Sequence, residues 1–323
     1  MRPSRTMLLV WILLAVSDVS AGTLRQTLQD HAVPISGFTL QELDAAVDSA
    51  AVVSDEGRFL LAYPTFEGGE AVRGPLQVIA FDRTTGKLVR RRINSPEVSE
   101  FCLGSVLEIA QQAEYLLIET HINPSASCTL ILGTDLRVVH TLFAWKVAQL
   151  GPRGLLLEED QIHFAPVHPL RLTVFDLASG QMQEIYPPDN DSLRARFSKD
   201  LSSHLPPRSW CAEHNHPCDP ASFDEELRNP VFAQASGTRV AFIVTFSAER
   251  FGDDAARSIG LRSAMYVYRR EEDGWSYCQQ ELAGDEVEKR QAQLHSDFEA
   301  ATESCSAATK VTVARVDSPF SNR

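Results

Sequence analysis

The chain has 323 residues, of which 30 are lysine or arginine and 43 are aspartate or glutamate, so its formal net charge is −13 at neutral pH. An acidic chain without a basic stripe repels phosphate backbones, which argues against a nucleic-acid-binding protein. The length is sufficient for one large domain or two ordinary ones, each with a substantial core.

The N-terminal residues have the order of an export signal. Arg2 and Arg5 precede an apolar run from Met7 to Val16, and small residues end at Ala21. A signal peptidase recognises this order. The run is about half as long as a membrane span requires, so an uncleaved anchor is the weaker alternative. We therefore expect residues 1–21 to be a cleaved signal peptide, and the protein to be secreted or periplasmic with no membrane span.

The segment 22–50 has a helical pattern. Thr23 with Gln26, and Thr39 with Glu42, have the spacing at which a threonine side chain caps the first turn of a helix and the third helical residue reaches back. We expect two short helices here, separated by the residues around Pro34.

A repeated unit of two β-hairpins begins near residue 51. The first hairpin of each unit consists of a short apolar segment, a polar turn and a second apolar run, as in AVVSDEGRFLLAY, LEIAQQAEYLLIET, VAQLGPRGLLLEE and VFAQASGTRVAFIV. The second hairpin follows in LQVIAFDRTTGKLVRRRI, LILGTDLRVVHTL, RLTVFDLASGQMQEIY and MYVYRREEDGWSYCQQ. Asp82 with Gly86, and Asp176 with Gly180, mark the same turn in two copies. Four-stranded units at this period are typical of propeller blades.

The phrases SDEGRFLLAY and LQVIAFDRTTGKLVRR resemble the repeat of bacterial β-propellers of the Tol-associated and WD40-like kind. The resemblance covers about 230 residues, from residue 50 to about residue 280, and implies a mostly β fold with a propeller-like repeat of about four recognisable four-stranded antiparallel blades. We expect the propeller-like domain to span 51–323, including the insertion and the C-terminal helix described below. It implies no chemistry, because propellers host many functions. A β-sandwich is the alternative fold.

Two segments interrupt the repeat. The insertion 187–230 is polar, is expected to include short helices, and contains WCAEHNHPCDP. A loop of this length inside a compact domain is usually functional or disordered. The segment 284–305 has an apolar helical face that includes Leu294 and Phe298, so we expect one C-terminal helix against the last blade. TKVTVARV, which follows, is interpreted as one more strand.

Five histidines lie in loops that a propeller brings to one face. The loop between blades and the loop between the second and third strands of a blade leave the sheet at the same end, since successive strands run in opposite directions. This places the insertion near the segments after Thr120 and around residue 163. The candidate ligand-binding residues are Glu119, His121, His163, His168, His214 and His216. The alternative is that these histidines are separate surface or structural residues.

All six cysteines follow the signal segment, and an even number in an exported chain indicates disulfides. We predict the pairs Cys102–Cys128, Cys211–Cys218 and Cys278–Cys305. Cys211, His214, His216 and Cys218 also form a candidate zinc set, but their spacing is tighter than in paired zinc knuckles.

The sequence favours a binding or interaction module whose loop-rich, histidine-containing face receives a small ligand, a glycan or a protein partner. We expect a monomer with no cofactor. A metal-assisted hydrolase or lyase that uses the clustered histidines is the alternative from another class, and a structural envelope component is a third. The ligand is not identified by the sequence.

Overall fold

The computed structural model describes residues 22–65, 74–123, 126–159, 171–185, 191–192, 195–196, 199, 208–213, 230–246, 262–271, 274–303, 305, 309–311 and 315–316. The chain divides into two compact units, one of residues up to 122 together with 130–139, and the other of 123–129 together with residues from 140 onward. The fold is mostly β, with blade-like antiparallel sheets of four or five strands and a few short helices, which confirms the predicted fold class.

The first sheet corresponds to the first predicted repeat. In sequence order it contains β3 (Ala51–Ser54), β4 (Arg58–Pro64), β5 (Leu76–Asp82) and β6 (Lys87–Ile93). The Asp55 carboxylate closes the first hairpin by accepting hydrogen bonds from the backbone N–H groups of Gly57 and Arg58, each 2.8 Å long. Asp82 and Gly86 close the second hairpin, as the sequence predicts.

The second sheet follows the second repeat in the same way. Its strands are β7 (Val106–Gln112), β8 (Tyr115–Asn123), β9 (Ala126–Leu132) and β10 (Val138–Leu142), and a 3-10 turn, η1 (Glu100–Cys102), precedes it. The strand order β10-β9-β8-β7 again follows the chain. Of these strands, β7 contacts β3 and β4 of the first sheet.

The third and fourth sheets each add a C-terminal strand to a four-strand meander. The third has β11 (Ala144–Leu150), β12 (Gly154–Glu159), β13 (Arg171–Asp176), β14 (Met182–Ile185) and β20 (Arg315–Val316). The fourth has β15 (Pro230–Ser236), β16 (Arg239–Phe246), β17 (Arg262–Glu271), β18 (Gly274–Leu282) and β19 (Thr309–Val311). The single strand predicted for TKVTVARV is therefore two strands, and they pair with different sheets.

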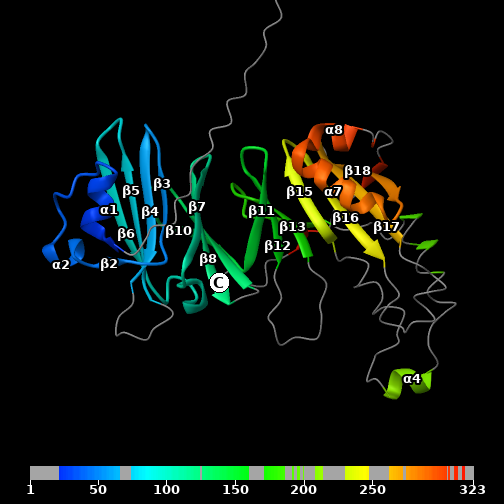
Figure 1. The fold of residues 1–323 in the computed structure, drawn as a ribbon, viewed down its shortest axis with the longest axis horizontal. Helices are drawn as coiled ribbons and strands as arrows, with labels where there is room; N and C mark the ends of the chain where they lie inside the picture. The colour runs from blue at the N-terminus through cyan, green and yellow to red at the C-terminus, as the bar shows by residue number, and fades with distance from the viewer. Residues whose placement is uncertain are drawn as a thin grey trace, which may run out of the picture. The chain divides into compact units, whose positions relative to one another are not determined.

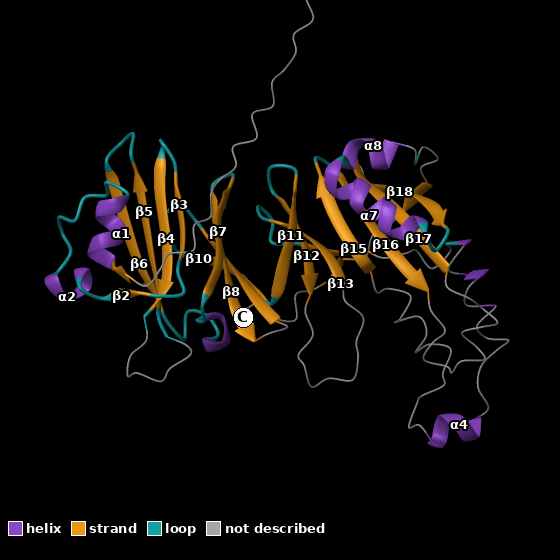
Figure 2. Cartoon of the chain, in the orientation of Figure 1, coloured by secondary structure: helices purple, strands orange, loops and turns teal. Residues whose placement is uncertain are grey.

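The core of the second unit lies on both faces of the fourth sheet. Alternate residues of β16 point to opposite faces: Val240 and Phe242 pack with Leu156 and Val174 of the third sheet, whereas Ile243 packs under the C-terminal helices. These helices, α7 (Glu286–Ser296) and α8 (Phe298–Glu303), lie across the sheet in Figure 2.

The C-terminal helical segment differs from the prediction in one respect. We expected one helix over 284–305, and the structure has two. Asp297 leaves helical geometry (φ −149°, ψ 76°) and ends α7, and its carboxylate then accepts a hydrogen bond from the Ala300 N–H, 3.1 Å long, in the first turn of α8. The break turns the chain so that Ala301 is buried together with Leu294.

Two predicted disulfides are present, Cys102–Cys128 and Cys278–Cys305. The second joins β18 to the residue that follows the last helical turn, with its Cα atoms 5.7 Å apart. Within the insertion, for which the sequence predicts short helices at 192–201 and 221–227, the structure describes α4 (Arg208–Glu213), which lies between those two stretches. The predicted Cys211–Cys218 pair and most of the insertion lie outside the described residues.

The predicted N-terminal helices cover one face of the first sheet (Figure 1). They are α1 (Leu24–Asp30) and α2 (Leu40–Leu43), flanked by the paired strands β1 (Gly22–Thr23) and β2 (Ala46–Val47). Leu24 and Leu28 of α1 pack with Phe59 and Leu61 of β4. No helix in the described ranges is long and apolar enough to cross a membrane. Residues 1–21 lie outside those ranges.

Candidate functional site

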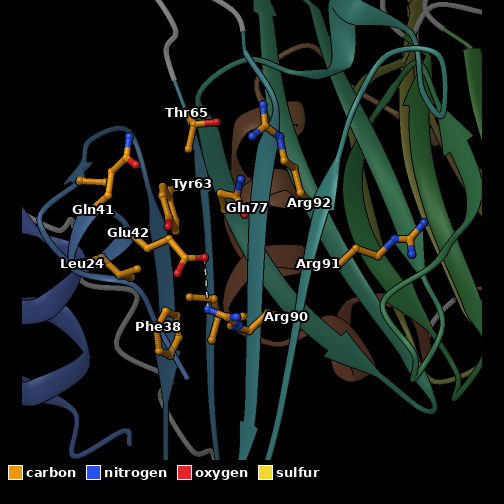
Figure 3. A pocket seen from close by; sticks show the side chains of 12 residues that line it. Leu24, Phe38, Gln41, Glu42, Tyr63, Thr65, Gln77, Arg90, Arg91 and Arg92 are labelled. Atoms are coloured by element: carbon orange, nitrogen blue, oxygen red, sulfur yellow. Dashed lines mark hydrogen bonds and ion pairs between the residues drawn. The ribbon is translucent and has the colours of Figure 1, made fainter. Parts of the chain in front are cut away.

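The candidate site is a pocket of about 550 Å³ between the N-terminal helices and the first sheet (Figure 3). Helical residues form one side and strand residues of β4, β5 and β6 form the other. Its lining consists of Leu24, Phe38, Gln41, Glu42, Ala45, Tyr63, Thr65, Gln77, Ile79, Arg90, Arg91 and Arg92.

The register of the first sheet explains the position of the pocket. Leu61 of β4 is opposite Ile79 of β5, which is opposite Arg90 of β6. Leu61 and Ile79 belong to the apolar core under α1, whereas Arg90 is exposed at the edge of the sheet. The next row on the same face, two residues along each strand, is Tyr63, Gln77 and Arg92. Polar side chains are thus added to the face of the sheet beside the core that α1 covers.

Helix α2 supplies an ionised carboxylate to the rim. Glu42 accepts hydrogen bonds from the Thr39 backbone N–H (2.6 Å) and the Thr39 hydroxyl (3.0 Å), while the Thr39 hydroxyl accepts from the Glu42 N–H (3.2 Å), which completes the predicted capping box. The backbone hydrogen bond from Thr39 is the largest cause that lowers the Glu42 pKa, and the Arg90 charge lowers it further.

Arg90 is held between a carboxylate and an aromatic ring. Its Nη1 lies 3.4 Å from Glu42 Oε1, and its guanidinium carbon lies 4.2 Å from the centre of the Phe38 ring. The ion pair is exposed to solvent, so it contributes little to stability, but the two contacts together fix the guanidinium at one wall of the pocket. The charge of Arg90 is therefore balanced within the site.

The second row consists of Tyr63, Gln77 and Arg92. Tyr63 is only 4% exposed, and burial, with a smaller contribution from the Glu42 charge, raises its pKa to about 12. Among the described residues, neither the Tyr63 hydroxyl nor the Gln77 amide has a hydrogen-bond partner. Arg92 is oriented by Asn94, whose Oδ1 accepts a 3.1 Å bond from Arg92 Nε.

Arg91, between the two pocket arginines, belongs to the opposite face. It points away from the pocket in Figure 3, and its Nη2 lies 2.6 Å from Glu97 Oε1. The alternation of strand residues therefore places two of the three consecutive arginines on the pocket side.

This arrangement suits binding. Its lining holds two guanidinium groups, a phenol, side-chain amides and a hydroxyl, next to the apolar surface of Leu24, Phe38 and Ile79. Glu42 is the one carboxylate in the lining, and it accepts a hydrogen bond from the Thr39 N–H at the helix cap and forms an ion pair with Arg90. Polar groups that converge beside an apolar floor are typical of small-molecule sites. No group of three or more potential metal-ligating side chains occurs in the part of the chain that the structure describes.

Of the site residues predicted from the sequence, two lie in described parts of the chain. Glu119 is buried in β8 (8% exposed), where it is opposite Glu108 of β7. His121 also belongs to β8, and its backbone N–H donates to the Ser105 carbonyl (2.8 Å), so it is not in the loop where we expected it. The strand runs on to Asn123 and shortens that loop. His163, His168, His214 and His216 lie outside the described residues, and the histidine-rich face stays a prediction.

The pocket is not predicted from the sequence. Arg90 and Arg92 are exposed residues of β6, which is the edge strand of the first sheet, and charged side chains are common at such positions. The alternation of Arg90, Arg91 and Arg92 therefore does not by itself mark a site.

The comparisons with known proteins identify no family. No protein-family model and no curated protein matches the chain. Two solved structures resemble it at 10% sequence identity. The first is S. cerevisiae Dbp5 bound to Nup159, Gle1, IP6 and ADP, with a TM-score of 0.28 over 72% of this chain and 58% of that chain. The second is the tricorn protease, with a TM-score of 0.30 over 74% of this chain and 32% of that chain. The chain spans less than two thirds of either structure, and at these TM-scores neither likeness bears on function.

Proposed function

We propose that the protein is a secreted or periplasmic binding module and that the pocket beneath α1 and α2 is its site for a small ligand. The observation that carries the proposal is that Tyr63 and Gln77 line the pocket opposite each other with no hydrogen-bond partner among the described residues, next to Leu24, Phe38 and Ile79. Polar groups that converge beside apolar side chains are typical of small-molecule sites.

The setting outside the cytoplasm is part of the proposal. The disulfides Cys102–Cys128 and Cys278–Cys305 support it, because such bonds persist in oxidising compartments. The N-terminal sequence pattern supports it independently. We also propose membership of the bacterial propeller-repeat proteins, which the blade-like sheets and the phrase SDEGRFLLAY support.

A fragment screen by NMR on the purified protein tests the ligand site. We expect the amide signals that shift on addition of small acids, amides and sugars to cluster at the pocket, and Gln41→Trp, which narrows its mouth, to remove those shifts. Leu40→Trp is the matched control, because Leu40 is on the same helix, is 73% exposed and does not line the pocket. Shifts that persist in the Gln41→Trp protein would contradict the proposal.

A further inference from the structure

Two uncharged polar side chains of the pocket lie next to each other. Tyr63 of β4 is directly opposite Gln77 of β5, and the two are adjacent in Figure 3. Side chains opposite each other in antiparallel strands have Cβ atoms about 5 Å apart. Neither the Tyr63 hydroxyl nor the Gln77 amide has a hydrogen-bond partner among the described residues. One small polar group of a ligand can therefore contact both side chains.

The charged side chains on the pocket side of the sheet are already engaged. Glu42 and Arg90 form an ion pair with 3.4 Å between Oε1 and Nη1. Arg92 donates from Nε to Asn94 and has a further interaction of its own. A ligand that carried a full charge would lose its hydration in the pocket, and it would meet charged side chains that already have partners. The polar group that fits this lining is therefore uncharged.

Tyr63 and Gln77 together call for a ligand group that both accepts and donates. Burial raises the pKa of Tyr63 to about 12, so its hydroxyl stays protonated and donates. The Gln77 amide holds N–H donors and a carbonyl acceptor in one plane. A primary amide matches this set, because its carbonyl accepts while its N–H donates. A carboxylate has no hydrogen to donate and an ammonium group has no acceptor, so each leaves part of the Gln77 amide unmatched.

Apolar side chains next to this polar pair receive the rest of the ligand. Leu24, Phe38 and Ile79 belong to the lining, and they pack in or against the core of the first sheet. Phe38 is half-buried, so part of its ring is accessible. Removing apolar ligand surface from water at these side chains favours binding without regard to direction. The amide then fixes the orientation of the ligand.

We propose that the pocket binds uncharged primary amides with a short apolar body. The ligand carbonyl accepts from the Tyr63 hydroxyl and the Gln77 N–H, and the ligand N–H donates to the Gln77 carbonyl. The body contacts Phe38, Leu24 and Ile79. This inference rests on the proposed ligand site and names the ligand class of that site.

A series of ligands with one body tests the proposal by NMR titration of the purified protein. Pentanamide is the expected ligand, butyl methyl ketone replaces its NH₂ by a methyl group of similar size, and pentanoate replaces the amide by a charge. We expect pentanamide to bind about tenfold or more tightly than either of the other two. Acetamide, which lacks the apolar body, is expected to bind about tenfold more weakly than pentanamide.

Two substitutions separate the roles of the polar pair. Gln77→Leu should weaken pentanamide binding about tenfold and remove the preference for pentanamide over the ketone. Tyr63→Phe should weaken the binding of both about fivefold and keep the preference, because both ligands carry the carbonyl that Tyr63 binds. Tyr115→Phe is the matched control: it removes the hydroxyl of a tyrosine in β8 that does not line the pocket, and it should change binding by less than about twofold.

The outcomes separate this inference from the proposed site. If the ketone or pentanoate binds as tightly as pentanamide, with shifts that Gln41→Trp removes, the amide assignment is wrong and the ligand site remains. An effect of Tyr115→Phe as large as that of Tyr63→Phe would also overturn the assignment. The ligand series on the native protein gives this decision even if Gln77→Leu does not fold. If no probe shifts pocket signals, both proposals fail.

Discussion

Two buried tyrosines of this protein differ in whether their hydroxyl has a partner. Tyr266 is fully buried and donates a 2.9 Å bond to the carboxylate of Asp191, which is 1% exposed. Burial and the Asp191 charge hold the Tyr266 pKa well above its usual range. Tyr63 is similarly buried, but its hydroxyl has no partner among the described residues. The same chemical group therefore has a structural role at one position and is available to a ligand at the other.

These two tyrosines predict different effects of the same substitution. Tyr63→Phe should change the free energy of unfolding by less than about 0.5 kcal/mol, because its hydroxyl lines the pocket and has no hydrogen-bond partner to lose among the described residues. Tyr266→Phe should lower it by about 1 to 3 kcal/mol, since Asp191 then loses a hydrogen bond in a buried position. Urea denaturation of both variants measures the difference, and equal losses in the two would contradict the assignment.

His140 makes stability depend on pH. Its ring is half-buried, 5.1 Å from the centre of the Phe175 ring and edge-on to it, and burial lowers the His140 pKa from its usual 6.5. The unfolded chain therefore binds this proton more readily than the folded chain does. The contribution of His140 to stability is complete above pH 6.5 and decreases as the pH falls below it.

We expect the urea midpoint of the native protein to fall between pH 7.5 and pH 5.5 and the fall to be smaller in His140→Gln. The other histidines are common to both proteins, so the difference between the two slopes isolates His140. Parallel slopes would show that His140 does not carry the effect.

At the scale of elements, the β5–β6 turn of the first sheet and the β13–β14 turn of the third sheet have the same hydrogen bonds. Asp82 accepts from the N–H groups of Thr84 and Thr85, and Asp176 accepts from those of Ala178 and Ser179. Gly86 and Gly180 end these turns with φ of +67° and +68°, in the left-handed region that favours glycine. Their surroundings differ, because a Cβ at Gly86 would meet nothing within 4 Å, whereas one at Gly180 would lie 2.7 Å from His140 Cε1.

The different surroundings of Gly86 and Gly180 predict different costs for the same substitution. Gly86→Ala should lower the free energy of unfolding by about 1 to 2 kcal/mol, the cost of a left-handed alanine. Gly180→Ala should cost about 1 to 3 kcal/mol more, because the methyl group displaces the His140 ring. Adding His140→Ala should remove most of that excess. If the two alanine variants lose the same stability, the contact between Gly180 and His140 is not significant.

At the scale of the whole molecule, the insertion is anchored at its beginning. Asp191 accepts from Tyr266 of β17, and Arg196 lies 2.9 Å from Glu281 of β18. None of the described residues of the insertion before Pro230 belongs to a sheet. The anchor and the rest of the insertion are thus separable parts of the sequence.

Replacing 200–229 with a short linker should leave the β content and the melting temperature nearly unchanged, because the anchor is retained. Replacing 189–229 should preserve the β content but lower the melting temperature by about 3 °C or more, since it also removes Asp191 from the buried hydrogen bond. Circular dichroism of the two shortened proteins gives both quantities. A large loss of β content in either would mean that the insertion contributes to the sheets.

The sequence by itself determined the local structure of this protein. The four pairs of hairpins, the aspartate and glycine turns and the Thr39 capping box depend on hydrogen bonds within a few residues and on the alternation of side chains along strands, so they can be recognised in a short window. The two described disulfides were also predicted, Cys102–Cys128 from blade topology and Cys278–Cys305 from the apolar face of the C-terminal helical segment.

Only the tertiary structure decided what the helices cover and where their cover ends. Glu42 and Phe38 meet Arg90 across about fifty positions of sequence, and Tyr63, Gln77 and Arg92 meet only through the register of three strands. Whether an arginine in a strand faces solvent or a pocket depends on which segment packs above it. The break at Asp297 and the division of the last strand between two sheets likewise depend on long-range packing, since short-range patterns there fit one helix and one strand equally well.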